Sequence, residues 1–300
     1  MNSGGLPFVK GHGTENDFVL IPDLEGRVRL TAAQVAAICD RRAGIGGDGI
    51  LRVVPTDAEP DAAAYCGAAR WFMDYRNADG SIAEMCGNGI RVFARYLVDA
   101  GLEPAGTIPI ATRGGVRTVD CPATGPITVD MGPAQLPDLG EIAVRVGERT
   151  WPARAVFMPN PHAVVFVDDL ADAGDLRTAP LVTPAEAYPE GVNVEFVVRV
   201  GPGHLALRVH ERGSGETRSC GTGICAAAVA AGRAGGPDGY LVEVPGGRLE
   251  ITETESGSVL MTGPAVLVAA GEWHGDIGWS EEAIPWDASV QTAAVGTGSA

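Results

Sequence analysis

The sequence predicts a mixed α/β protein made of two similar domains, and three observations support this fold class. The chain has 300 residues, of which 45% are hydrophobic, and this is enough for two domains that each bury a core. Short β-branched runs separated by glycine and proline predict strands joined by tight turns. The motif Cys-Gly-X-Gly-Ile occurs at residues 86–90 and again at 220–224, so the chain contains an internal repeat.

The clearest helices follow the two copies of this motif. Hydrophobic spacing predicts helices over residues 89–98 and 223–231, and a third is expected over Thr31–Arg41 because a threonine can cap its first turn. The helix at 223–231 is nearly all alanine and valine, so we expect it to be buried and wrapped by strands. Strands are predicted at residues 127–130, 164–167, 194–198 and 205–210.

The repeat also predicts where the domains begin and end. Two equivalent units of about 130 residues imply two domains related by approximate twofold pseudosymmetry. The Pro/Gly-rich stretch at 121–126 suggests a boundary, which gives an N-terminal half over 1–127 and a C-terminal half over 128–264. Residues 275–300 lack hydrophobic periodicity, and we expect them to form a mobile tail.

The charge and the apolar pattern argue against several classes of partner. A net charge of -16 and a pI of about 4.7 disfavour nucleic acid and anionic membranes, because the field of such a protein repels phosphates. No apolar run approaches the roughly 18 residues of a membrane span, and the N-terminus lacks the apolar segment of a secretion signal. We therefore expect a cytoplasmic protein that acts on a small molecule.

The cysteines and lysines limit the chemistry further. Six irregularly spaced cysteines do not suggest a disulfide framework or a zinc site, so free thiols and no metal are expected. Lys10 is the only lysine, and no phosphate-binding motif lies near it. A pyridoxal-phosphate enzyme needs a lysine for its Schiff base, so we expect no cofactor.

The repeated motif places Cys86 and Cys220 each at the start of a predicted helix. The positive end of a helix lowers the pKa of a thiol, so a thiolate base is expected at both positions. The glycines that follow leave the first helical N–H groups open to a carboxylate. Two such helix starts facing each other across a cleft would hold one substrate Cα between two sulfurs and stabilise its carbanion. The pattern predicts cofactor-independent racemisation or epimerisation, and the other four cysteines are expected to be inert or packed in a core.

Seven motifs resemble those of the diaminopimelate epimerase family, and they follow the family's order from about residue 8 to residue 270. They lie at residues 11–18, 40–48, 75–81, 85–91, 160–162, 191–194 and 211–223. The resemblance implies that each domain is a rolled, mostly antiparallel sheet around a central helix, with a strand at about 265–274 returning to the first domain. It also implies interconversion of LL- and meso-2,6-diaminopimelate on the route to lysine and peptidoglycan, and it leaves open whether the chain forms a homodimer.

The resemblance extends to individual site residues. It makes Cys86 and Cys220 the two acid/base residues. It places four backbone N–H groups on the carboxylate at the reacting centre, those of Gly87, Asn88, Gly221 and Thr222. The side chains that match substrate contacts are Asn16, Asn77, Asn160, Asn193, Glu211 and Arg212. Arg212 suits the distal carboxylate and Glu211 an ammonium group. His162 and Glu211 match residues that assist the thiols, although His162 would equally suit the ordering of its own loop.

The chain departs from the family pattern at three positions. Gly49 stands where many relatives carry glutamine, so a side-chain contact must be replaced by the backbone, by water or by a neighbour. Pro159 replaces a common glycine, and Val92 replaces a frequent cysteine. Two other functions remain open, a proline or hydroxyproline racemase and a thiol redox switch. Asn88 favours diaminopimelate over proline, because relatives that act on proline typically carry histidine there. A phenazine-biosynthesis-like relative is disfavoured, because such relatives lack the cysteine pair.

Overall fold

A computed structural model describes residues 5–275, so the expected tail falls outside the described residues except for its first residue. The described chain divides into two compact units. Unit 1 contains residues 5–13, 17–127 and 265–275, and unit 2 contains residues 14–16 and 128–264. No helix in the described range is long and apolar enough to cross a membrane.

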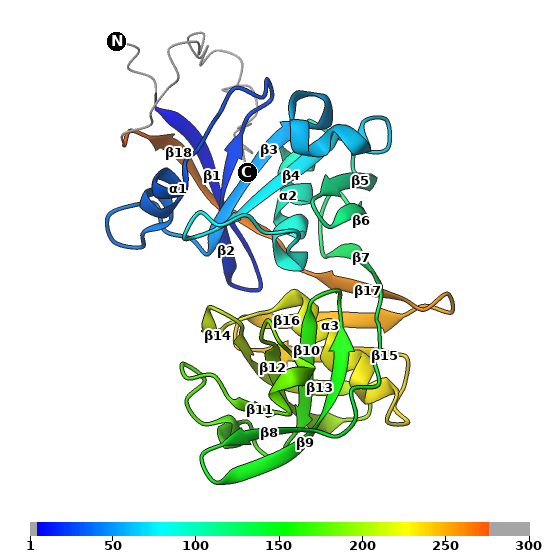
Figure 1. Cartoon of the computed structure of the whole chain (residues 1–300). Coiled ribbons are helices and arrows are strands. Elements are labelled where there is room, and N and C mark those ends of the chain that lie inside the picture. Colours follow the sequence, from blue (N-terminus) through cyan, green and yellow to red (C-terminus); the bar gives the residue numbers. More distant parts are fainter. Residues whose placement is uncertain (1–4, 276–300) are drawn as a thin grey trace. The chain divides into compact units, whose positions relative to one another are not determined.

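Unit 1 is a twisted sheet with one long helix and one short helix (Figure 1). Its strands are β1 (Leu6–Gly13), β2 (Asn16–Pro22), β3 (Gly49–Pro55), β4 (Trp71–Asn77), β5 (Gly106–Thr112), β6 (Gly115–Cys121) and β18 (Val266–Trp273). Its helices are α1 (Ala32–Cys39) and α2 (Gly87–Asp99), with 3-10 turns η1 (Thr56–Ala58) and η2 (Pro60–Tyr65). Strand pairs β2–β3 and β4–β5 are parallel, whereas β1–β18, β3–β4 and β5–β6 are antiparallel.

The short helix α1 starts as predicted and ends two residues early. Thr31 caps it in a capping box, in which Gln34 N–H donates to the Thr31 hydroxyl and Thr31 N–H donates to Gln34 Oε1. At the other end, the N–H groups of Arg42 and Ala43 donate to the Asp40 carboxylate at 2.8 and 2.6 Å. This turn competes with a further helical turn, so the helix stops at Cys39 rather than at residue 41.

Unit 2 contains the second long helix inside a larger set of strands. Its strands are β7 (Ile127–Pro133), β8 (Ile142–Val146), β9 (Arg149–Phe157), β10 (Pro161–Phe166), β11 (Leu181–Thr183), β12 (Asn193–Gly201), β13 (His204–Glu211), β14 (Gly215–Thr217), β15 (Gly239–Val244), β16 (Gly247–Glu253) and β17 (Ser258–Gly263). Its helix is α3 (Gly221–Gly232), with 3-10 turns η3 (Leu170–Ala173) and η4 (Ala185–Ala187). The four strands predicted from β-branched runs are confirmed as β7, β10, β12 and β13.

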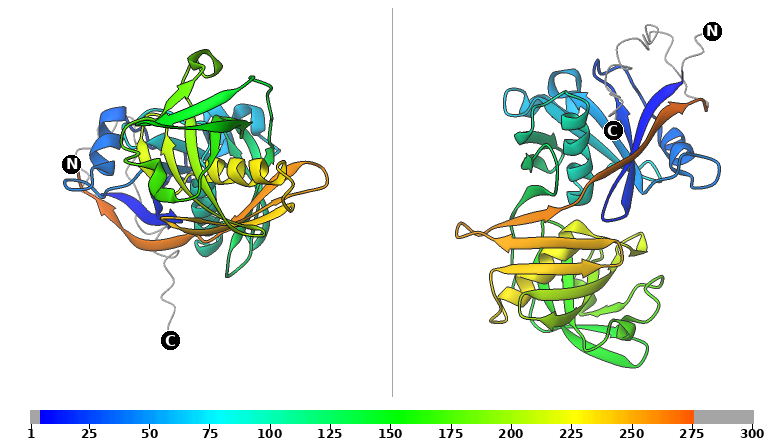
Figure 2. Two further views of the ribbon diagram at one scale, coloured as in Figure 1. Left: turned by 90° about the horizontal axis from the view of Figure 1, so that it is seen from below. Right: turned by 180° about the vertical axis from the view of Figure 1, so that it is seen from behind.

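The helix α3 is buried on nearly all sides. It contacts strands β9, β10, β12, β13, β15, β16 and β17, and Figure 2 shows these strands around it. Ten of its residues are buried, as expected for a helix of alanine, valine and glycine that has no polar face. The prediction that this helix is wrapped by strands is confirmed.

The two units repeat one topology. In unit 1 the sequence of pairs is parallel β2–β3, antiparallel β3–β4, parallel β4–β5 and antiparallel β5–β6. In unit 2 it is parallel β10–β12, antiparallel β12–β13, parallel β13–β15 and antiparallel β15–β16. The long helix follows the third strand of each series, α2 after β4 and α3 after β13 and the short β14. The predicted fold class, a mixed protein with two similar halves that each surround a helix, is confirmed.

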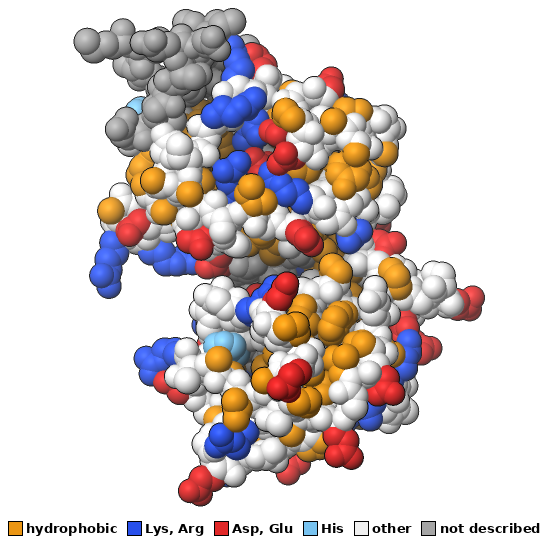
Figure 3. Space-filling view, viewed as in Figure 1, with side chains coloured by type: hydrophobic (Ala, Val, Ile, Leu, Met, Phe, Trp, Pro, Cys, Tyr) orange, Lys and Arg blue, Asp and Glu red, His pale blue; other side chains and the backbone are white. Residues whose placement is uncertain are grey.

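The surface of both units carries mixed charge. On the face shown in Figure 3, acidic and basic side chains are interspersed over each unit, with apolar atoms between them. Many of the charges are paired, for example Arg208 with Glu216 at 2.7 Å and Arg248 with Glu243 at 2.7 Å. Exposed pairs of this kind contribute little to the free energy of folding.

Candidate active site

In unit 1 the first cysteine motif forms the start of α2. Cys86 is the residue that caps this helix, and the Gly89 N–H donates to its sulfur at 3.4 Å. The three residues that follow Cys86 are buried in the first turn. Helix starts of this kind carry unpaired N–H groups and a positive partial charge, which suit a carboxylate.

A buried arginine fixes the side chain of Asn88. Arg91 is fully buried and donates to Asn88 Oδ1 at 3.0 Å and to the Gly87 carbonyl at 3.2 Å. The Asn88 side chain is therefore held against its own helix, and its backbone N–H remains at the helix start. This arrangement suits the predicted role of Asn88 as a backbone donor rather than a side-chain ligand.

The structure explains why Gly49 departs from the family pattern. Gly49 begins β3 and pairs with Asn77 on β4. A Cβ atom at this position would lie 2.4 Å from the Arg76 carbonyl oxygen and 2.8 Å from Tyr75 Cε2. The Tyr75 hydroxyl in turn donates to Asn77 Oδ1 at 2.9 Å, and Asn77 Nδ2 donates to the Ser81 hydroxyl at 3.0 Å. The Arg76 backbone and the Tyr75 ring therefore leave no room for a side chain at position 49, and Tyr75 also binds Asn77.

The loop that leads to Asn16 is anchored by its neighbour Asp17. The Asp17 carboxylate accepts hydrogen bonds from Lys10 at 2.6 Å and from Arg41 at 2.7 Å. Although burial opposes ionisation, the bonds from Arg41 and Lys10 hold the Asp17 pKa well below its usual range. Asn16 begins β2, and residues 14–16 group with unit 2 rather than unit 1.

In unit 2 the second cysteine motif is surrounded by polar side chains. Cys220 caps α3 and is 5% exposed. Asn193 Nδ2 donates to the Cys220 sulfur at 3.9 Å, and the Thr222 hydroxyl lies 3.5 Å from it. The Arg212 N–H donates to Asn193 Oδ1 at 2.9 Å, which sets the orientation of this asparagine. The structure thus brings together four residues that the sequence predicted as parts of one site.

The expectation of a lowered pKa is wrong for Cys220. Burial raises its pKa well above the usual value, and the carboxylates of Glu211 and Glu195 raise it further, whereas the Thr222 hydroxyl opposes the shift only in part. Burial also raises the Glu211 pKa, while bonds from Thr217 and the Cys220 thiol lower it. Desolvation and two nearby carboxylates therefore outweigh the helix end, and Cys220 is a protonated thiol in the resting protein.

Glu195 is the residue of this site that the sequence analysis missed. Its carboxylate oxygen Oε1 lies 2.7 Å from His162 Nδ1, and both side chains are fully buried. The other ring nitrogen, Nε2, lies 3.2 Å from Asn160 Oδ1. The sequence did contain a signal, which is a glutamate inside the apolar run at 194–198. A glutamate in a buried strand is seldom left without a polar or charged partner, so a partner such as a histidine could have been sought.

Arg212 differs from the other candidate residues because its side chain reaches solvent. Its guanidinium donates to the Glu190 carbonyl at 2.8 Å, and 44% of the side chain is exposed. Among the predicted site residues of unit 2, Cys220, Asn193 and His162 are buried, Asn160, Glu211 and Thr222 are half-buried, and Arg212 is exposed.

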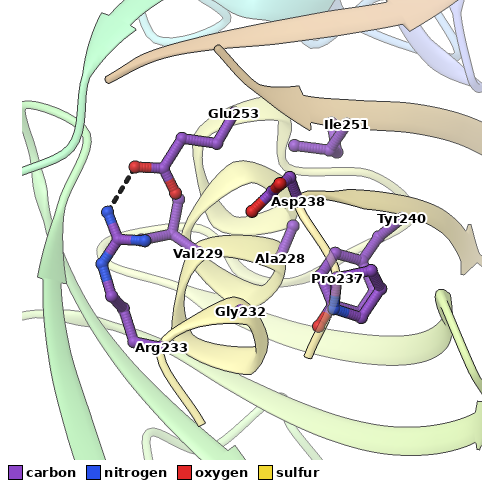
Figure 4. Close-up of a pocket in the computed structure, with 9 residues that line it drawn as sticks. All are labelled: Ala228, Val229, Gly232, Arg233, Pro237, Asp238, Tyr240, Ile251 and Glu253. Atoms are coloured by element: carbon purple, nitrogen blue, oxygen red, sulfur yellow. Dashed lines mark hydrogen bonds and ion pairs between the residues drawn. The ribbon is translucent and has the colours of Figure 1, made fainter. Parts of the chain in front are cut away.

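A shallow pocket lies at the other end of α3 and contains none of the predicted site residues (Figure 4). It is lined by Ala228, Val229, Gly232, Arg233, Pro237, Asp238, Tyr240, Ile251 and Glu253. Arg233 pairs with Glu253 across it. It lies beside the last turn of the helix, whereas Cys220 lies before the first.

The environments of the cysteines predict which thiol reacts first with iodoacetamide. Cys66 is exposed, which shows that the core interpretation is wrong for this residue, whereas Cys220 is buried with a raised pKa. Because alkylation requires the thiolate, we expect Cys220 to react at least about tenfold more slowly than Cys66 near neutral pH. Peptide mapping by mass spectrometry measures both rates, with Cys66→Ser as the control. Equal rates would contradict the buried, protonated state of Cys220.

Comparison with known proteins gives a consistent result over most of the chain. The sequence model of a family described as diaminopimelate epimerase matches residues 8–137 and 154–268. The diaminopimelate epimerase of Streptomyces coelicolor is 60% identical over 284 residues, which cover 92% of this chain and 97% of the relative. That of Thermobifida fusca is 51% identical and covers 89% of this chain and 97% of the relative.

Solved structures with much lower identity share the fold. A phenazine biosynthesis protein of the PhzF family from Bacillus anthracis aligns with a TM-score of 0.64 at 16% identity, covering 89% of this chain and 98% of that one. A hydroxyproline epimerase from Agrobacterium vitis aligns with a TM-score of 0.60 at 16% identity, covering 89% and 90%. At such identities the likeness shows a common architecture.

Proposed function

The chain belongs to the diaminopimelate epimerase family, and from this premise we propose that it interconverts LL- and meso-2,6-diaminopimelate with Cys86 and Cys220 as its two acid/base residues. The observation that carries the proposal is the repeated motif, since each cysteine caps the long helix of its own unit. A fold alone does not require the same Cys-Gly-X-Gly-Ile sequence at both helix starts. The enzyme is an isomerase, and its proposed place is the cytoplasm.

The proposed reaction needs a base on one face of the substrate Cα and an acid on the other. One cysteine, as thiolate, takes the α-proton, and the electron pair of the C–H bond becomes the carbanion. The other cysteine, as thiol, donates its proton to the opposite face, which inverts the centre and leaves a thiolate. Because Cys220 is protonated in the resting protein, it can serve as the proton donor in the turnover that starts from this state.

The developing negative charge would be stabilised by the N–H groups at the two helix starts. The donors proposed for the carboxylate at the reacting centre belong to Gly87, Asn88, Gly221 and Thr222. Preorganised donors of this kind stabilise a transition state because they need no reorientation during the reaction. Because they are backbone groups, a protein of net charge -16 can bind a dicarboxylate without a basic patch.

The other site residues are proposed to read the rest of the substrate. Arg212, whose guanidinium is half-exposed at the margin of the site, suits the distal carboxylate. The remaining proposed contacts are Asn16, Asn77, Asn160, Asn193 and Glu211. Glu211 is proposed to assist proton transfer at the thiols, and His162 is proposed to order the loop that carries Asn160.

Solvent isotope exchange tests this function. With LL-diaminopimelate in deuterated water, the meso product formed at early times should carry deuterium at the inverted carbon, while the recovered LL substrate remains unlabelled. This asymmetry is expected because the product proton comes from a thiol that has equilibrated with solvent, whereas the departing proton goes to a different sulfur. The initial label in each isomer can be measured by mass spectrometry.

A parallel incubation with proline provides the control for the substrate. Exchange of the proline α-proton without exchange of diaminopimelate would identify a proline racemase instead. Label in the recovered LL substrate at the same rate as in the product would contradict the two-base mechanism.

A further inference from the structure

The buried pair of His162 and Glu195 lies directly behind the start of α3. Strands β10 and β12 run parallel, and His162 is the neighbour of Asn193 in their register. The Glu195 carboxylate packs on the helix backbone, since a Cβ atom at Gly223 would lie 2.5 Å from Glu195 Oε1. The second glycine of this motif therefore makes room for a carboxylate.

The hydrogen-bond geometry determines the protonation of His162. Its Nδ1 atom faces a carboxylate oxygen of Glu195 at 2.7 Å, and its Nε2 atom faces the Asn160 amide oxygen at 3.2 Å. The Asn160 oxygen is an acceptor, and an ionised Glu195 carboxylate is a second one, so with Glu195 ionised both ring nitrogens donate and the ring is an imidazolium. The carboxylate compensates the charge of the ring, as a buried cation requires.

The other unit shows that the fold does not need this pair. Phe18 pairs with Gly49 in β2–β3 as His162 pairs with Asn193 in β10–β12, so Phe18 corresponds to His162 and Leu51 to Glu195. Both of these residues are fully buried.

The corresponding helix start in unit 1 has the same packing with apolar partners. A Cβ atom at Gly89 would lie 3.3 Å from Leu51 Cδ2 and 3.4 Å from Phe18 Cζ. The same place behind a cysteine motif is thus apolar in one unit and ionic in the other. Apolar groups usually stabilise such a position at least as well as an ion pair, which points to a functional reason for the charges.

We propose that Glu195 is a positioning residue, which holds His162 as an imidazolium so that the ring fixes the orientation of the Asn160 amide. The imidazolium binds the amide oxygen, and the amide NH2 group is thereby turned away from the ring and presented to a carboxylate of the substrate. Without the charge on Glu195, the ring loses a proton and can accept from the amide NH2 group instead, which turns the amide around. The proposal rests on the proposed function, because it assigns Asn160 to the diaminopimelate site.

The protonation of His162 can be measured directly. In protein labelled with 15N-histidine, the two ring nitrogens of an imidazolium give nearly equal shifts, whereas those of a neutral ring are far apart. We expect the His162 ring to give the imidazolium pattern in the wild type. In Glu195→Gln we expect a neutral ring, because glutamine keeps the shape and removes the charge. Glu211 and Tyr188 also lie near His162, and neither is changed by this substitution.

Kinetics separate amide orientation from proton transfer. If the pair acts through Asn160 on binding, Glu195→Gln should raise KM for both isomers about tenfold and change kcat by less than about threefold. A fall in kcat at unchanged KM would place the pair in proton transfer and overturn the proposal. So would a neutral His162 ring in the wild type.

A double substitution tests whether the pair serves folding. The variant His162→Phe with Glu195→Leu copies the apolar arrangement of unit 1, and we expect it to be soluble, to melt within a few degrees of the wild type and to share the raised KM. Failure of this variant to fold would assign the pair to stability and overturn the proposal.

A matched control is available in the same unit. His204 Nε2 lies 3.4 Å from Glu243 Oε1 in a half-exposed pair, and Glu243→Gln removes the same charge from it. This variant should leave KM, kcat and the His162 signals unchanged, and a similar rise in KM here would show a nonspecific charge effect. If the wild type lacks epimerase activity, the proposed function fails, while the NMR experiment still tests the state of the pair.

Discussion

Replacing Cys220 by alanine is expected to reduce epimerisation by about 10³-fold or more, and Cys86→Ala should have the same effect. Each substitution removes one of the two groups proposed to exchange a proton with the substrate, and no neighbouring residue can replace a thiol at that position. The steady-state rate from LL- to meso-diaminopimelate measures the loss. Turnover close to that of the wild type in either variant would contradict the two-base mechanism.

Both variants should remain folded. Cys220 makes no side-chain capping bond, and the bond from the Gly89 N–H to the Cys86 sulfur is long at 3.4 Å, so we expect little loss of helix stability with either thiol. Cys225→Ala is the matched control, because it removes a buried thiol one turn further along the same helix. We expect this control to retain activity, and thermal melting of all three variants checks their fold.

The two variants should also fail in different ways. A protein with one remaining thiol can still remove the α-proton from one face and return a solvent deuteron to the same face. We therefore expect Cys220→Ala to exchange the α-proton of one isomer and Cys86→Ala to exchange that of the other. If one variant exchanges the α-proton of neither isomer, the cysteine that remains in it cannot remove the α-proton without the other cysteine. The pattern of exchange also assigns each sulfur to its isomer.

The sequence was most informative where a local rule and a repeated motif agreed. The helices predicted at 89–98 and 223–231 are confirmed, each extended at both ends to Gly87–Asp99 and Gly221–Gly232. The glycine-rich motif predicts where each helix starts, and the apolar run that follows predicts the body of the same helix, so the two signals support each other. By contrast β11 and β14 have three residues each and were not predicted, because they exist through pairing with β8 and β13.

The electrostatics of the candidate site could not be predicted from local sequence. The helix-end rule gave the wrong direction for the Cys220 pKa, since Glu211 and Glu195 come from two other strands and burial depends on the whole unit. His162 and Glu195 are separated by more than thirty residues and meet only because β10 and β12 are neighbours. The motif therefore identified the thiol, and the fold determines its charge environment.

The same comparison changes how the internal repeat is understood. Asn77 ends β4 and Glu211 ends β13, and the two strands occupy equivalent places in their sheets. Unit 1 therefore has uncharged side chains, Asn77, Phe18 and Leu51, at the three positions that correspond to Glu211, His162 and Glu195 of unit 2. The two cysteine motifs thus share a backbone pattern but differ in the charged side chains around them.

Glu211→Gln is expected to reduce kcat/KM by about 10²-fold, the typical contribution of a positioned acid/base group. Glutamine can keep the hydrogen bond to the Thr217 hydroxyl, so the strand end should stay in place while the charge beside Cys220 is lost. Glu216→Gln is the matched control, because Glu216 lies on the adjacent strand β14 and pairs with Arg208 at the surface. This control should keep the activity of the wild type.

The pH profile shows whether the carboxylate itself is required. In the proposed role, an ionised Glu211 accepts the Cys220 proton when this sulfur serves as the base, so activity in that direction should be present above the Glu211 pKa and lost as pH falls through it. Burial raises this pKa, and the acid limb of kcat/KM should therefore lie above the usual glutamate value of 4.5. The carboxylates of Asp17 and Asp74 have lowered pKa values, so the stability that they contribute persists to lower pH and is lost only below that limb. The limb should disappear in Glu211→Gln, and a profile that keeps it unchanged would exclude Glu211 as the titrating group.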